Sequence, residues 1–211
     1  MKVSIALKTL LGTAALTLPL VASAASTYST GNAGLTAAAP VDFSVVIPKI
    51  LYLRVGSGST YTTGALSTVN TVDLITFSPA VGTVGNSTAV AGTGGDLTGG
   101  VETAAVVSNS GNVTLVATAS GALSDGAGDT IPFTQITTAA AANTAGYTLL
   151  PAPVLSNGTS STVTLTAPAS KTITADAKWT FSYANSVTVP GGTYGGVNTN
   201  NSRVTYTATM P

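Results

Sequence analysis

The chain has 211 residues, of which 7% are charged, with seven Lys or Arg against seven Asp or Glu, and it contains no histidine and no cysteine. These absences exclude disulfides, Ser-His-Asp and Cys-His nucleophiles, and thiolate or imidazole metal ligands. Because the few cations are scattered along the chain, no basic stripe could neutralise phosphates, and nucleic-acid binding is not expected.

The first 24 residues have the order of a secretory signal peptide. Lys2 and Lys8 precede an apolar run at 9–21, and the tripeptide Ala-Ser-Ala follows at 22–24. The run is shorter than the roughly 20 residues of a membrane-spanning helix, and signal peptidase accepts an A-x-A ending. We therefore expect cleavage after residue 24 and export from a bacterial cell. The mature protein would lie in the periplasm, on the cell surface or outside the cell, with no transmembrane segment.

The remaining chain divides into an extension and one domain. Residues 25–40 are small and polar, with Tyr28 and Leu35 as the larger apolar side chains, which predicts a flexible N-terminal extension. Residues 41–211 have the length of a single domain. Its Thr-rich, sparsely charged surface offers little repulsion to close packing, as in proteins of extracellular layers or filaments. The simpler interpretation is a Thr-rich β-sandwich without such a role.

Apolar residues alternate with threonine along much of the domain, which indicates half-buried antiparallel strands. Turn-forming clusters of Gly, Ser, Asn and Asp separate the strands, and residues 139–145 are expected to form a loop. The pattern predicts an all-β fold, an immunoglobulin-like antiparallel β-sandwich. The expected strands are 41–47, 50–55, 72–78, 101–108, 113–118, 131–136, 162–166, 177–184 and 204–209.

Aromatic residues allow two interpretations. Trp179, Phe181 and Tyr183 lie on one face of a predicted strand, which places the tryptophan most simply at the centre of the core. The alternative is a stacking surface for a glycan or another small ligand, for which Trp179 and Tyr194 are the candidates, with Tyr61 and Tyr147 as further rings.

Acidic residues offer little for catalysis. Glycoside hydrolysis needs two carboxylates about 5 to 10 Å apart, and most of the aspartates lie in turns or at strand starts. The loop from Asp125 to Asp129, reading DGAGD, is a candidate calcium site, although a plain hairpin turn explains it better. We expect no cofactor and no enzymatic activity.

Two stretches carry a resemblance to known proteins. They read FSVVIPKILYLRVGSG at 43–58 and PGGTYGGVNTNNSRVTYTATMP at 190–211. They resemble exported bacterial surface and pilus-like β-sandwich proteins, namely spore-coat-U-like or fimbrial-type subunits and an uncharacterised exported proteobacterial family. The resemblance implies an immunoglobulin-like fold in which a neighbour's N-terminal extension adds a strand. The chain departs from it by lacking the usual cysteine pair, and residues 25–40 lack the apolar alternation of such a strand.

Together these features predict an exported, non-catalytic structural or adhesive protein of the cell surface. Its partners would be copies of itself or other surface proteins, in a coat or a filament, because neutral faces and open strand edges favour such contacts. The alternative is a secreted glycan-binding or small-ligand-binding β-sandwich module.

Overall fold

A computed structural model describes residues 26–58 and 66–211. The chain divides after Ile47 into two units, residues 1–47 and residues 48–211. The predicted signal peptide and Tyr61 lie outside the described residues. In the part described, no helix is long and apolar enough to cross a bilayer.

The described part of the first unit, residues 26–47, forms neither helix nor strand. One local contact holds residues 27 and 38 together: the Thr27 hydroxyl donates to the Ala38 carbonyl at 2.6 Å and accepts from the Ala38 N–H at 2.8 Å. The prediction of a strand at 41–47 is wrong. Its alternation is that of a strand, but its backbone joins no sheet and its side chains are exposed.

The described part of the second unit is all-β, and the one helical element in it is a 3-10 turn at Phe133–Gln135. The longer strands are β5 (Val101–Ser108), β6 (Val113–Ala119), β9 (Ile136–Ala141), β12 (Ile173–Tyr183) and β13 (Val204–Thr209). The shorter strands are β1 (Leu51–Val55), β2 (Ile75–Thr76), β3 (Val90–Ala91), β4 (Thr93–Gly94), β7 (Leu123–Ser124), β8 (Thr130–Ile131), β10 (Thr148–Leu149) and β11 (Val163–Leu165).

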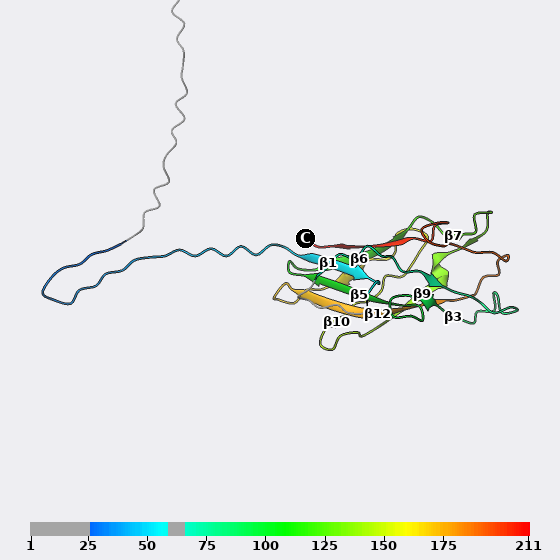
Figure 1. The fold of residues 1–211 in the computed structure, drawn as a ribbon, viewed down its shortest axis with the longest axis horizontal. Helices are drawn as coiled ribbons and strands as arrows, with labels where there is room; N and C mark the ends of the chain where they lie inside the picture. Colours follow the sequence, from blue (N-terminus) through cyan, green and yellow to red (C-terminus); the bar gives the residue numbers. More distant parts are fainter. Residues whose placement is uncertain (1–25, 59–65) are drawn as a thin grey trace, which may run out of the picture. The chain divides into compact units, whose positions relative to one another are not determined.

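Two larger sheets make up the domain (Figure 1). The six-stranded sheet has the order β1-β5-β12-β10, and β3 and β9 also pair with β12. All of its pairings are antiparallel except that of β10 with β12. The three-stranded sheet has the antiparallel order β11-β6-β13. Two small two-stranded sheets, β2-β4 and β7-β8, complete the described strands.

One hydrophobic core lies between the two larger sheets. Leu115 of β6 and Ala177 of β12 are fully buried in the same cluster. The rings of Trp179 on β12 and Tyr206 on β13 are 5.3 Å apart, which joins the two sheets directly. The sheets therefore form two layers around the alternating apolar faces that the sequence predicts.

Several predicted strands are confirmed, and others differ for local reasons. The strands 101–108 and 204–209 coincide with β5 and β13. The strand predicted at 131–136 is broken by the 3-10 turn, since Pro132 precedes it and supplies no backbone donor. Residues 139–141 form a strand rather than a loop, because β12 offers them an edge for pairing.

Candidate functional site

Trp179 lies at the centre of the core. Its side chain has no exposed surface, and its indole N–H donates to the Leu150 carbonyl at 2.9 Å. Phe181 and Tyr183 are buried on the same face of β12, as the sequence predicts. A ring without an exposed face cannot stack on a sugar, so Trp179 is a core residue and not a ligand platform.

Tyr194, the second stacking candidate, is half-buried and its hydroxyl donates to the Pro190 carbonyl at 2.9 Å. Burial, and then the charges of Asp129 and Asp125, raise the pKa of this phenol. Tyr147 is also half-buried. With Trp179 in the core, the structure does not bring the candidate rings together on one exposed face.

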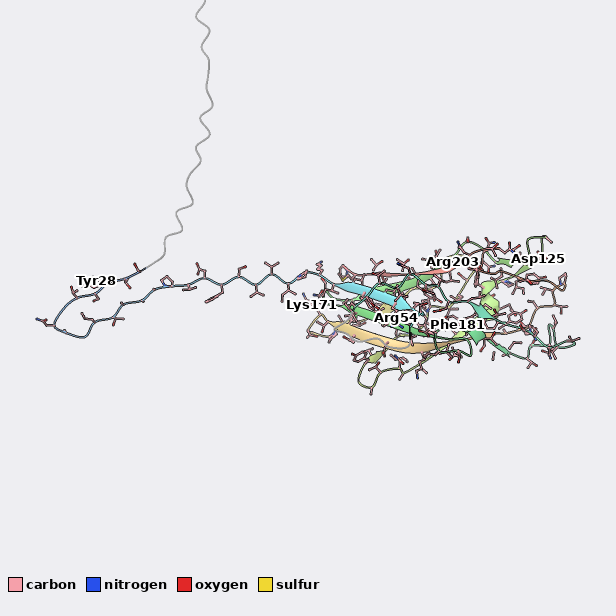
Figure 2. The ribbon with its side chains drawn as sticks, viewed as in Figure 1. Tyr28, Arg54, Asp125, Lys171, Phe181 and Arg203 are labelled. Carbon is pink, nitrogen blue, oxygen red and sulfur yellow. The ribbon has the colours of Figure 1, made fainter. Side chains whose placement is uncertain are left out.

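The loop from Asp125 to Asp129 connects β7 and β8 at one end of the domain (Figure 2). Asp125 Oδ1 accepts backbone N–H bonds from Ala127 at 2.8 Å and from Gly128 and Asp129 at 3.1 Å. These bonds lower the pKa of Asp125, that from Ala127 most. The carboxylate thus closes a hairpin turn. Among the described residues, no three acidic side chains form a group that could hold a metal ion.

A buried polar network at the end of β1 and the start of β5 was not anticipated from the sequence. Arg54 of β1 approaches Asp96 at 3.6 Å, Nη2 to Oδ2, and both side chains are buried. Asp96 Oδ1 accepts the Thr103 N–H at 2.8 Å, and Asp96 Oδ2 accepts the Thr103 hydroxyl. The Arg54 Nε group donates to the Gly56 carbonyl at 3.1 Å. The ion pair thus anchors the turn after β1 and the loop before β5.

Two further carboxylates belong to this network. Glu102 Oε2 and Asp73 Oδ2 both lie against Gly56, where a β-carbon would collide with them. Asp73 also accepts the Ser57 N–H, and the Ser57 hydroxyl at 3.1 Å. Gly56 has a φ of 74°, so the turn requires glycine both for its backbone conformation and for the space it leaves.

Glu102 is 5% exposed and accepts the Asp96 N–H at 3.3 Å. Burial, and then the neighbouring charge of Asp73, raise the pKa of Glu102 to about 8. Such a carboxyl carries a proton at neutral pH, as a general acid would. A cavity of about 280 Å³ is lined by Arg54 and Gly56 of this region, and its lining does not include Asp73, Asp96 or Glu102. The network therefore joins the turn after β1 to the loop before β5.

One signal for this network was present in the sequence. Glu102 is the chain's one glutamate, and its position in the predicted strand 101–108 places it on the same face as Ala104 and Val106, which are buried. A carboxyl on a core-facing position needs polar partners. The identity of those partners, Asp73 and Asp96, depends on how distant loops meet.

The hydrophobic core is less well covered where β1 and β13 border it. In the described part of the chain, β1 pairs with β5 alone and β13 with β6 alone, and the two strands contact each other across the layers. Core-facing residues of β6 are at most 6% exposed, whereas those of β1 and β13 are only half-buried. We call this region the β1–β13 seam; it comprises Leu53, Val55, Val204, Tyr206, Ala208 and Met210.

The 280 Å³ cavity lies along β1. Its lining includes every residue of 51–56, together with residues 67–69 and 71. Since successive side chains of a strand point to opposite faces, a cavity lined by all of them runs along the strand's edge. Residues 67–69 and 71 thus lie across this cavity from β1.

Comparison with known proteins supplies no relative from which a role could be transferred. A role must therefore be inferred from features of the described residues, among them the hydrogen-bonded turn at 125–129, the buried acid network and the half-buried β1–β13 seam. No family model, no curated protein and no solved structure matches this chain.

Proposed function

We propose that the mature protein is an exported, non-catalytic structural or adhesive subunit of the bacterial cell surface, which makes contacts with copies of itself or with other surface proteins. Its domain would be an immunoglobulin-like β-sandwich, and the leader at 1–24 would be removed on export. The two-layer, all-β core and the absence of histidine and cysteine from the sequence support this proposal.

The observation that carries the proposal is the exposure of an apolar segment, residues 41–47. Phe43 is 91% exposed, Val46 88% and Ile47 75%. Monomeric soluble proteins rarely leave a contiguous apolar stretch in water, and such stretches mark binding surfaces. The segment is therefore best explained as a contact that another molecule completes.

The buried acid network supports the non-catalytic part of the proposal. Its carboxylates are engaged by backbone N–H groups, by Arg54 and by the Thr103 hydroxyl, and Asp96 has a side chain only 2% exposed. A reacting group must reach its substrate, and these groups face protein instead.

Expression of the full chain with its own leader in a Gram-negative host tests the proposal. We expect an intact mass that begins at Ala25 in the periplasmic or extracellular fraction, and assemblies in negative-stain images of cells and medium. Light scattering of the purified mature protein should give a mass well above that of one chain. An unprocessed cytoplasmic protein, or a freely diffusing monomer, would contradict it.

A further inference from the structure

We infer that a polar hollow beside Arg203 binds a sugar residue that carries a carboxylate, namely a uronic acid. This inference goes beyond the proposed function, because a subunit needs no such site in order to assemble. It also differs from the stacking surface considered in the sequence analysis, since the lining of the hollow includes no aromatic ring.

The hollow has a volume of about 260 Å³ and lies where a loop leads into β13. Its lining consists of Ser120 and residues 198–203, and every one of these side chains is polar. Pockets for drug-sized ligands are mostly apolar and measure about 300 to 1,000 Å³. A polar hollow just below that range fits one small hydrophilic group, such as a single sugar ring.

Arg203 gives the hollow a positive charge without a counter-ion. Its side chain is half-buried, and it makes no ion pair or hydrogen bond with the described residues, whereas Arg54 pairs with Asp96. A guanidinium presents its N–H groups as a planar fork that matches a carboxylate through two hydrogen bonds. Arg203, which directly precedes β13 and is labelled in Figure 2, is therefore the group that would hold the carboxylate.

Uncharged side chains of the lining would hold the hydroxyl groups of the sugar. Ser120, Asn198 and Asn200 make no side-chain hydrogen bond within the part of the chain that the structure describes. A hydroxyl and an amide can each donate and accept, as the hydroxyls of a sugar do. A ligand with both a carboxylate and hydroxyls would thus use both kinds of contact, whereas a simple anion would use only Arg203.

The balance of charge favours a carboxylate over a phosphate. Arg203 is the one cationic side chain in the lining, and the other lining side chains are neutral. A phosphate ester carries nearly two negative charges at neutral pH, and one guanidinium would leave part of that charge without a partner. A single carboxylate surrounded by hydroxyls matches one cation among neutral hydrogen-bonding groups.

The loop is held in place by bonds that leave these side chains free. The Ser124 N–H donates to the Asn200 carbonyl at 3.0 Å, and the Asn201 side-chain amide donates to the Ala122 carbonyl at 3.1 Å. Both bonds tie the loop to the region of β7. A loop that is already ordered loses less conformational entropy when a ligand binds, which favours affinity.

The backbone of the loop is unusual in the same place. Asn198, Asn200 and Asn201 have φ values of 52°, 50° and 60°. Asparagine tolerates the left-handed region better than most residues, but three such residues within four positions are uncommon. Conformations of this kind cluster at ligand-binding loops, where the surrounding structure must maintain them. The bonds from the β7 region provide that support here.

Titration calorimetry of the purified protein tests the ligand class. The probes are D-galacturonate and D-glucuronate; D-galactose and D-glucose have similar ring hydroxyls without the carboxylate, and acetate has the carboxylate without the hydroxyls. We expect at least one uronate to bind at least about tenfold more tightly than its neutral sugar and than acetate, because a hydrogen-bonded ion pair and the hydroxyl contacts each add affinity.

Two results of this titration would overturn the inference. If neither uronate binds, the hollow is not a site for acidic sugars. If inorganic phosphate or acetate binds as tightly as the better uronate, the hydroxyl contacts contribute nothing and Arg203 is a simple anion site.

A pair of charge-removing variants tests the location of the site. Arg203→Gln removes the guanidinium from the hollow, and Lys178→Gln is the control, because Lys178 is an exposed cation on β12 that is not among the lining residues. We expect Arg203→Gln to weaken uronate binding at least about tenfold and Lys178→Gln to change it less than about twofold. Equal losses in the two variants would show a non-specific charge effect and overturn the inference. Melting curves of both variants check that the fold is intact.

The outcome is separable from that of the proposed function. A protein that assembles but binds neither uronate refutes this inference and leaves the proposed function standing. A monomer that binds a uronate through Arg203 supports this inference and refutes assembly.

Discussion

The segment 41–47 and the strand β6 have nearly the same sequence pattern but opposite surroundings. Both are seven residues long and have an apolar residue at every odd-numbered position. Leu115 of β6 is fully buried between two partner strands, whereas Val45 of the segment is 84% exposed and pairs with none. A period of two identifies the apolar face of a strand, but a free sheet edge must be available before that face is buried.

Removing one side chain from each region gives the largest difference. We expect Leu115→Ala to lower the free energy of unfolding by about 3 kcal/mol, because it leaves a cavity in a close-packed core. Val45→Ala should change it by less than about 0.5 kcal/mol, since the residue already lies in water. Urea unfolding of the monomeric domain at low protein concentration measures both. Similar losses would mean that the segment packs onto its own domain.

Glu102 is buried, unlike the side chains of the segment 41–47, and its ionisation should therefore affect the stability of the domain. Its folded-state pKa of about 8 lies above the usual 4.5, so the folded state binds the proton more tightly. The stability from Glu102 is therefore complete below about pH 4.5 and is lost as the pH rises through 8. The loss should be on the order of 2 to 4 kcal/mol once solvent screening of the charge is allowed for. Asp73, Asp96, Arg54 and Tyr206 are the charged or titratable groups around it.

The variant Glu102→Gln tests whether Glu102 makes the domain less stable as the pH rises. The amide keeps a neutral group at the position, so we expect the variant to lose most of the dependence of stability on pH between 5 and 8. The sequence contains no histidine, which would otherwise titrate in this range. Thermal unfolding of both proteins across that range is the measurement. Parallel curves would mean that Glu102 is already ionised in the folded protein.

A substitution in the turn after β1 should give the next largest loss of stability. Gly56→Ala places a β-carbon against Glu102 and Asp73, at a φ of 74°. Gly82→Ala is its control, because the φ there is 84° but no atom lies within 4 Å of the new β-carbon. We expect a loss of about 2 kcal/mol or more for Gly56→Ala and about 1 kcal/mol for Gly82→Ala. Equal losses of stability in the two variants would show that the Glu102 and Asp73 carboxylates move away from the new β-carbon without an energetic penalty.

Some of these features could be predicted from the sequence and others could not. β5, β13 and the burial of Trp179 follow from local periodicity, so they could be predicted. The acid network could not, because Gly56, Asp73 and Asp96 come from separate turns that meet only in the folded domain. The segment 41–47 has the periodicity of a strand but joins no sheet among the described residues, because pairing depends on the available sheet edges, which no local pattern specifies.

The smallest expected effect concerns the loop first considered for calcium. Asp125→Ala removes the acceptor of three backbone N–H bonds and should lower the melting temperature slightly, whereas Asp129→Ala in the same turn should not, since Asp129 donates its backbone N–H there. Because the same bonds lower the pKa of Asp125, its contribution is present above its unfolded pKa and is lost as the pH falls through the folded value. Melting curves with and without millimolar calcium complete the test. A rise with calcium that Asp125→Ala abolishes would make the loop a metal site, while unchanged curves would leave it a turn.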